Sequence, residues 1–378
     1  MIAAVNPEII IWARKRTGLS IQELADKVKR PLTEIQRWED GTTIPSYTTL
    51  EALAYRHFKI PLAVFFFPEP PEVDDPVGSF RRLPDSEFDK LSSDTREKIR
   101  LAQTYQDSLA ELLPSSGEKP IYTRYRATPS TLPSLAEDVR SYLGVSIGRQ
   151  FSFRSTDAAF KAWRHALEHR GIFTFKDSLD DRFISGFCLL SNICPIIMVN
   201  NSNAFSRQIF TLAHELGHIL LGVYGITDVD EDYIDFMSEK DRRAEIACNR
   251  FAADLLVPLR AFRNELGNLS PADPQVVNQL ARRFSVSREV VLRRLLDDGR
   301  IDEDEYAKRA SEWNRDYMRR RPETPGGNWY LTRLSYLGEG YTRLAFDHHQ
   351  QGTISTSELA GHLNVKARNI AKLREHLW

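Results

Sequence analysis

The stretch Phe210-Thr-Leu-Ala-His-Glu-Leu-Gly-His-Ile-Leu-Leu-Gly222 decides what the centre of this chain can be. An α-helix places residues i and i+4 on one face, so His214 and His218 can both reach one Zn²⁺ ion while Glu215 addresses a water on that ion. Catalytic zinc takes three protein ligands and lowers the pKa of its water, whose proton Glu215 would accept. The plain alternative is a buried helix with incidental histidines, but unpaired imidazoles and a carboxylate are costly inside an apolar helix.

The third ligand must come from elsewhere in the chain. Glu245 lies 27 residues after His218, a distance that suits a second helix folded back on the first. Asn249 follows one turn later on the same face, where it can hydrogen-bond a ligand or an active-site histidine. The residues leave open a solvated Glu245, and they leave open rival ligands in an acidic loop: Asp228, Asp230, Glu231, Asp232 and Asp235.

A second pattern, His165-Ala-Leu-Glu168-His169, matches the reversed H-x-x-E-H arrangement of another class of zinc peptidases. The apolar residues of this segment form one stripe, and Lys161, His165, Glu168 and His169 lie on the other side. We therefore expect a solvated helix face here rather than a metal site.

Around the zinc motif the pattern alternates between helices and short β-rich runs. Helices are predicted over 85–113, 158–169, 206–222 and 241–256, with a Pro/Ser/Gly-bearing connection over 114–133. Strands are predicted over 171–175, 184–190 and 195–200. Beyond Pro258 the chain reads as mostly helical, so the centre is α+β and its surroundings are α.

Composition sets the limits of the whole chain. A length of 378 residues, with 42% hydrophobic and 27% charged residues, predicts two to three folded domains. No apolar run is long enough to cross a bilayer, and the first 30 residues do not resemble a signal peptide. Three cysteines are too few for a disulfide scaffold, so a cytoplasmic location is expected, with no membrane partner. The net charge of -1 neither indicates nor excludes a nucleic-acid partner.

The first 67 residues have the layout of a helix-turn-helix domain. Ser20 and Glu23 have the spacing of a capping box, a three-residue turn follows Val28, and Pro31 suits the first turn of the next helix. The run of four prolines between Phe67 and Pro76 ends this unit.

Two family resemblances rest on these residues. The segment 207–222, followed by Glu245-x-x-x-Asn249-x-Phe-Ala-Ala-x-Leu-Leu-Val-Pro258, resembles the ImmA/IrrE family of gluzincin-like metallopeptidases over roughly residues 150–300. The resemblance implies zinc ligands at His214, His218 and Glu245, a catalytic base at Glu215, and a helix-turn-helix repressor as protein substrate.

The N-terminal unit resembles the XRE (lambda-repressor-like) family, down to Trp38-Glu-Asp-Gly41 and Ile44-Pro45-Ser46. The resemblance implies that the second helix is a recognition helix that enters a major groove of DNA. The residues that would face the groove are Lys29, Arg30, Thr33, Gln36 and Arg37. Gln22 and Thr43 would lie near phosphates.

Charge limits the DNA interpretation. Residues 1–67 hold nine Lys+Arg and seven Asp+Glu, Lys29 stands where the family commonly has Gly, and Glu34 and Glu39 bring anions onto the recognition helix. A protein-docking or dimerising module is therefore a rival interpretation, and a homodimer is one form of it.

The tail holds two more segments with helix-turn-helix rhythm, over 279–296 and 354–373. The first lies where the peptidase family often has such an element. The second is equally consistent with a helical hairpin packed against the peptidase, since residues 301–378 hold twelve bases and eleven acids.

The sequence thus predicts a multidomain, mainly α protein with an α+β centre. Its predicted parts are a helix-turn-helix domain over 1–70, a helical linker over 71–150, a zinc metallopeptidase domain over 151–265 and a helical region over 266–378. The predicted function is zinc-dependent endopeptidase and regulator, cleaving a partner repressor in a stress, mobile-element or phage-defence response. Two alternatives remain: a DNA-binding regulator or toxin-antitoxin component whose peptidase fold acts as a sensor, and a transcription factor that senses a small ligand.

Overall fold

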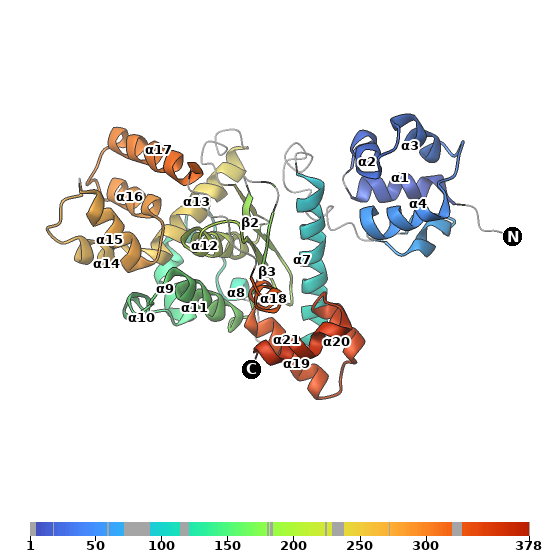
Figure 1. Cartoon of the computed structure of the whole chain (residues 1–378). Helices are drawn as coiled ribbons and strands as arrows, with labels where there is room; N and C mark the ends of the chain where they lie inside the picture. The colour runs from blue at the N-terminus through green and yellow to red at the C-terminus, as the bar shows by residue number, and fades with distance from the viewer. Residues whose placement is uncertain are drawn as a thin grey trace. The chain divides into compact units, whose positions relative to one another are not determined.

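The computed structural model divides the chain into two compact units, Met1–Leu101 and Ala102–Trp378. It describes residues 5–17, 19–58, 60–71, 91–113, 121–179, 181, 184–223, 225–228, 238–271, 273–319 and 327–377. The multidomain, mainly helical fold with an α+β centre that the sequence predicts is confirmed (Figure 1). Among the described helices, none carries a stretch that is both long and apolar enough to cross a membrane.

In the described residues up to Phe67, six short helical elements pack around a shared apolar core. They are α1 (Pro7–Arg16), α2 (Ile21–Val28), α3 (Leu32–Glu39), α4 (Tyr47–Ala52), the π-helix η1 (Leu53–Phe58) and the 3-10 helix η2 (Leu62–Phe66). The predicted capping box is present: the Glu23 amide donates to Ser20 Oγ at 3.1 Å, and the Ser20 amide donates to Glu23 Oε2 at 2.7 Å. Lys29 ends α2 in the left-handed conformation, with φ 55°, and Pro31 stands one residue before α3.

The helix predicted over 85–113 is α7 (Ser93–Leu112), which begins in the first unit and ends in the second; residues 85–90 lie outside the described residues. The described part of the predicted connection 114–133 holds a short helix, α8, and the start of η3. Helices then precede the sheet in this order: α8 (Ile121–Arg124), η3 (Leu132–Leu135), α9 (Ala136–Leu143), α10 (Ile147–Phe151) and α11 (Thr156–Glu168).

The sheet has the strand order β1-β3-β2-β4 within the described residues. Its strands are β1 (Phe173–Asp177), β2 (Ile184–Leu189), β3 (Ile196–Asn200) and β4 (Gly225–Asp228). β1 runs parallel to β3, whereas β2 runs antiparallel to both β3 and β4. The sequence did not predict β4, whose residues open a stretch that we expected to be an acidic loop.

Side chains of β1 alternate between two covered faces of the sheet. Phe175 stacks on Tyr105 of α7, with ring centroids 4.6 Å apart, while Lys176 lies over Phe160 of α11 and Phe205, at 5.0 and 4.8 Å. Because both faces are covered, all five residues of β1 are buried, including the polar Thr174, Lys176 and Asp177.

Two long helices, α12 (Phe205–Leu221) and α13 (Glu239–Leu256), lie side by side, and α12 packs against this sheet (Figure 1). Two glycines allow the close approach. A Cβ atom on Gly186 of β2 would lie 2.6 Å from Thr211 Cγ2, and one on Gly217 of α12 would lie 3.1 Å from Cys248 Sγ and 3.3 Å from Cys248 Cα. α12 therefore packs between the sheet and α13, with glycine at the two closest approaches.

The described residues beyond Pro258 are mostly helical, as predicted. They form α14 (Leu259–Leu266), α15 (Pro274–Phe284), α16 (Arg288–Asp297), α17 (Glu303–Arg319), α18 (Trp329–Leu337), α19 (Glu339–Gln350), α20 (Thr356–His362), the 3-10 helix η5 (Ala367–Asn369) and α21 (Ile370–Leu377).

One expectation about α11 is wrong. Glu168, predicted on a solvated face, is buried, and its carboxylate accepts a hydrogen bond from Arg164 Nε at 3.0 Å. Arg164 in turn donates to the Ser335 carbonyl at 2.7 Å and to the carbonyls of Thr174 and Tyr336. The C-terminal helices cover this side of α11, which a helical wheel of α11 alone cannot reveal.

Candidate metal centre

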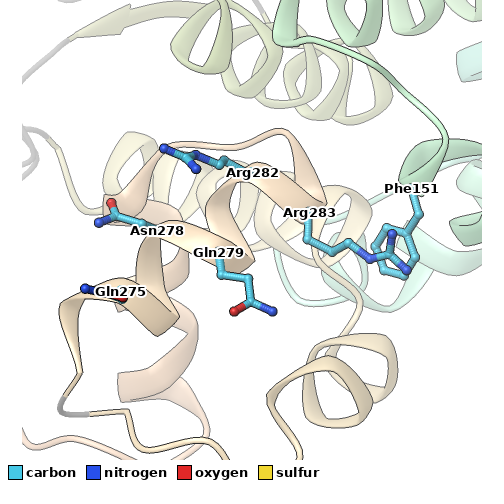
Figure 2. Close-up of a pocket in the computed structure, with 6 residues that line it drawn as sticks. All are labelled: Phe151, Gln275, Asn278, Gln279, Arg282 and Arg283. Carbon is cyan, nitrogen blue, oxygen red and sulfur yellow. The ribbon is translucent and has the colours of Figure 1, made fainter.

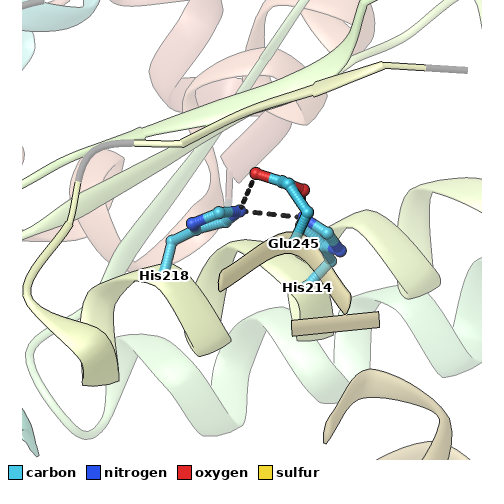
Figure 3. A group of neighbouring side chains, drawn as sticks. All are labelled: His214, His218 and Glu245. Carbon is cyan, nitrogen blue, oxygen red and sulfur yellow. Dashed lines mark hydrogen bonds and ion pairs between the residues drawn. The ribbon is translucent and has the colours of Figure 1, made fainter. Parts of the chain in front are cut away.

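Three side chains from α12 and α13 converge inside the second unit. His214 and His218 lie one turn apart on α12, and Glu245 reaches them from α13 (Figure 3). Their exposed fractions are 1%, 1% and 6%. Buried polar groups of this kind need partners, and here each of the three side chains contacts the other two.

The distances suit a single small cation. The Nε2 atoms of His214 and His218 lie 2.9 Å apart, and each lies 3.1 Å from an oxygen of Glu245. Donor atoms around a four-coordinate zinc ion lie about 3.3 Å from one another, since each bond is about 2.0 Å long. Two imidazoles and one carboxylate are also a donor set that zinc uses in catalytic sites. Among the described residues, this is the group of His, Cys, Asp or Glu side chains that could hold a metal.

A hydrogen bond fixes the ring of His214. Its Nδ1 lies 2.8 Å from Oδ1 of Asn249, one turn beyond Glu245 on α13. When Nδ1 carries the proton and donates it to this oxygen, Nε2 presents its lone pair to the point shared with His218 and Glu245. Asn249 therefore sets both the tautomer and the orientation of one candidate ligand.

The electrostatics keep Glu245 ionised. Burial by itself raises the pKa of a carboxyl group, but the adjacent rings of His218 and then His214 outweigh this effect and hold the pKa of Glu245 well below its usual range. A permanently charged carboxylate beside two imidazoles is suited to a divalent cation.

Glu215 lies between the two histidines in the sequence and is fully buried on α12. Two residues later, Gly217 forms the close contact with Cys248, which brings the backbone of α13 near enough for Glu245 to reach both rings. The spacing of the metal ligands does not by itself single out Gly217. A glycine inside a helix lowers the stability of that helix by about 1 kcal/mol relative to alanine. A glycine at such a position therefore indicates that a neighbouring element packs closely there.

The structure describes one of the two alternatives to this metal group, the pattern on α11, but not most of the acidic loop. His165 and His169 are exposed, with their Nε2 atoms 3.1 Å apart, but Glu168 is turned away from them into its pair with Arg164. Of the rival third ligands, Asp230, Glu231, Asp232 and Asp235 lie outside the described residues. The backbone of Asp228 ends β4, and its side chain is not described.

The candidate DNA-contacting side chains occupy the outer surface of the α2–α3 pair. All seven are exposed: Gln22, Lys29, Arg30, Thr33, Gln36, Arg37 and Thr43.

The two anions that weakened the DNA interpretation are both paired. Glu39 is 8% exposed and receives Arg14 Nε and Nη2 at 2.5 and 2.9 Å, so it faces inward. Glu34 lies 3.8 Å from Arg30. The exposed face of α3 is therefore less acidic than its sequence suggests.

An open groove of about 620 Å³ runs along α15 (Figure 2). Its lining is mostly polar and cationic, and consists of Phe151, Gln275, Asn278, Gln279, Arg282 and Arg283. The guanidinium of Arg283 lies 4.0 Å from the centre of the Phe151 ring. None of these side chains is a general acid or a usual metal ligand at neutral pH. The groove can therefore bind a ligand, but it offers no catalytic chemistry comparable to that of the metal group.

Comparison with known families agrees with this architecture. Residues 167–296 match the IrrE N-terminal-like domain, and residues 10–56 match a helix-turn-helix domain. The chain thus joins an XRE-type helix-turn-helix domain to an IrrE-like domain. The IrrE-like match contains the sheet, α12, α13 and the α15–α16 pair, whereas α18–α21 lie outside both matches. The IrrE-like family is one of metallopeptidases, and the described residues of this chain contain a buried His-His-Glu group.

Other similarities are weak. No curated protein sequence matches the chain. One solved structure, a Mycobacterium tuberculosis transcriptional regulator, is 21% identical over 45% of this chain, with a TM-score of 0.28. The match spans about half of that structure's length (52%), and a likeness this low carries no argument about function.

Proposed function

We propose that the second unit is a zinc-dependent endopeptidase whose metal ligands are His214, His218 and Glu245. The observation that carries this proposal is the convergence of three buried side chains: the two Nε2 atoms lie 2.9 Å apart and each lies 3.1 Å from one oxygen of Glu245. Both helices belong to the segment that matches an IrrE-like domain. Zn²⁺ bound there would supply a Lewis acid that lowers the pKa of water toward 7.

The residues of the chain divide the remaining work. The two Nε2 atoms and the Glu245 carboxylate hold the cation, and Asn249 keeps the His214 ring in place. Glu215 is the general base: its carboxylate accepts a proton from the attacking water and returns it to the amine nitrogen that leaves as the peptide bond breaks. Burial of these side chains strengthens every charge interaction among them.

The substrate we propose is a partner protein of helix-turn-helix type, cleaved in the cytoplasm during a stress, mobile-element or phage-defence response. This step rests on the family resemblance. A small repressor encoded beside this chain would be the first substrate to test.

The deciding experiment is Glu215→Gln in the full chain. We expect unchanged zinc content and a hundredfold or greater loss in the rate of repressor cleavage, because general-base catalysis contributes roughly that much. Glu239→Gln, on the exposed first turn of α13, is the matched control. Equal cleavage by the unmutated chain and Glu215→Gln, both loaded with zinc, would show the mechanism to be wrong.

A second candidate function is DNA-binding regulation by residues 10–56, with the peptidase fold as a sensor. It is supported by the exposed face of α3, from which Glu39 is withdrawn. Footprinting on the protein's own promoter, with and without residues 1–67, tests this function. Zinc content separates the two candidate functions. If the unmutated chain binds no metal, the peptidase function is excluded and the sensor function remains.

A further inference from the structure

Three helix pairs in this chain share one backbone turn. In the described residues, the non-glycine residues with positive φ are Lys29, Ser285 and Asn364, at 55°, 57° and 48°. Each ends the first helix of a pair: α2–α3, α15–α16 or α20–α21. In each pair the amide after the left-handed residue donates to the carbonyl five residues back, at 3.0, 3.0 and 2.9 Å. Such a turn holds two helices at a fixed angle.

The sequences of the three pairs align on this turn. Each has Leu-Ala at the same distance before it, as Leu24-Ala25, Leu280-Ala281 and Leu359-Ala360, and all six side chains are buried. A buried β-branched residue stands eleven positions after each leucine: Ile35, Val291 and Ile370.

The first and third pairs also share a capping box, Ser20 with Glu23 and Ser355 with Glu358. The third pair is thus built like the first.

The second pair has lost the outer face of its second helix. Leu292, which stands where α3 has Gln36, is fully buried. Arg288 lies 4.7 Å from the ring of Trp313 on α17, which covers α16. A helix covered in this way cannot enter a DNA groove.

The third pair has kept its outer face open. Arg368 and Lys372 stand where α3 has Thr33 and Arg37, and both are exposed. Among the described residues, no ion pair engages either side chain. Residues 355–377 hold four bases and two acids, and one of those acids, Glu358, is engaged by the Ser355 amide at 2.7 Å. The outer face of η5 and α21 is therefore cationic.

Neighbouring helices fix the orientation of this pair. Arg333 of α18 donates to the Leu363 carbonyl at 2.8 Å, and the Tyr341 hydroxyl of α19 donates to the His362 carbonyl at 2.8 Å. Both bonds engage carbonyls at the end of α20, directly before the turn, and both leave the opposite, cationic face uncovered. The basic side chains are consequently presented on a rigid support.

We propose that the α20–α21 pair is a second duplex-DNA-binding surface of this chain, with Arg368 and Lys372 on DNA phosphates (Figure 1). The partner follows from charge and shape: an exposed cationic second helix of a helix-turn-helix pair complements the regularly spaced phosphates beside a major groove. This surface lies outside both family matches and does not depend on peptidase activity.

The test measures binding of the full chain to a fluorescent 30-base-pair duplex by anisotropy, over a range of salt concentrations. Arg368→Ala with Lys372→Ala should weaken binding roughly tenfold at 0.1 M salt and make the slope of log affinity against log salt shallower by about 1 to 2. Arg260→Ala with Lys308→Ala removes the same charge from exposed positions of α14 and α17 and should change neither value.

A separate double variant, Thr33→Ala with Arg37→Ala, is measured in the same way. It weakens any DNA binding by the α2–α3 pair and leaves the α20–α21 pair unchanged. An unchanged slope in the Arg368/Lys372 variant, or an equal change in the Arg260/Lys308 control, would overturn the proposal. Tighter binding to a single-stranded RNA of the same length than to the duplex would also overturn it. An unchanged thermal transition in all variants excludes misfolding as the cause.

Discussion

The α12–α13 pair and the α2–α3 pair use two helices in opposite ways. In the first, the candidate functional side chains lie between the helices, with exposed fractions of 1% to 6%, and each depends on the others for its position. In the second, the helices bury an apolar core and a salt bridge, and the candidate functional side chains lie outside. A site built between helices should be sensitive to small changes in packing, whereas a site on the outer face should tolerate them.

The largest effect should follow removal of the ligand that joins the two helices. Glu245→Ala takes away the only carboxylate of the candidate metal group in the described residues, so zinc affinity should fall by about a thousandfold or more. Metal content after dialysis measures this loss. Glu239→Ala, on the same helix but exposed, should keep its zinc; if Glu245→Ala keeps it equally well, the third ligand is elsewhere.

The buried salt bridge of the first unit should give the next largest effect. Glu39→Ala leaves the Arg14 guanidinium, 11% exposed, without its carboxylate, so the free energy of unfolding should drop by about 3 kcal/mol. Glu34→Ala breaks only a more exposed pair of 3.8 Å on the same helix and should cost less than about 0.5 kcal/mol. Urea denaturation of both variants checks the contrast, and equal midpoints would mean that Glu39 is not structurally buried.

The close approach at Gly217 should come third. In Gly217→Ala, the added Cβ would lie 3.1 to 3.3 Å from atoms of Cys248, so we expect a loss of about 2 kcal/mol in stability and weaker zinc binding. Gly148→Ala, on α10 with nothing within 4 Å, is the matched helical control. Calorimetry and metal titration follow the two effects. If Gly217→Ala binds zinc as tightly as the unmutated chain, the spacing of the helices does not set the site.

The smallest effect should come from the outer face of α3. Arg37→Ala should weaken duplex binding by about tenfold or less, because it removes a cation that faces the groove, while stability and zinc content stay unchanged. The slope of log affinity against log salt should become shallower by about 1 or less. Anisotropy with the promoter duplex measures the first two quantities. A change in the thermal transition would contradict the assignment of Arg37 to an exposed, structurally tolerant position.

The sequence predicts the metal group better than it predicts the sheet, and the reason is physical. The i, i+4 spacing of His214 and His218 and the position of Glu245 on the next helix depend on local geometry, so the grouping was accessible from the sequence. β4 was not, because a four-residue strand in an acidic stretch is defined by its pairing with β2, about 40 residues earlier.

The error at Glu168 and the inward position of Glu39 share one cause. Both residues lie on faces that look solvated on their own helix, yet each faces a basic partner or a helix from another part of the fold. Helical periodicity reports only one helix at a time, so it cannot show what covers a polar face.

The guanidinium of Arg164 has a consequence for anyone who wishes to shorten this protein. It pairs with Glu168 of its own helix and donates to the carbonyls of Ser335 and Tyr336, which belong to α18. Deleting the chain after α17 would strip these acceptors from a buried cation and uncover Glu168 at the same time. A shortened peptidase should therefore be cut before Pro7 or within the segment 72–90, and its C-terminal helices should be kept.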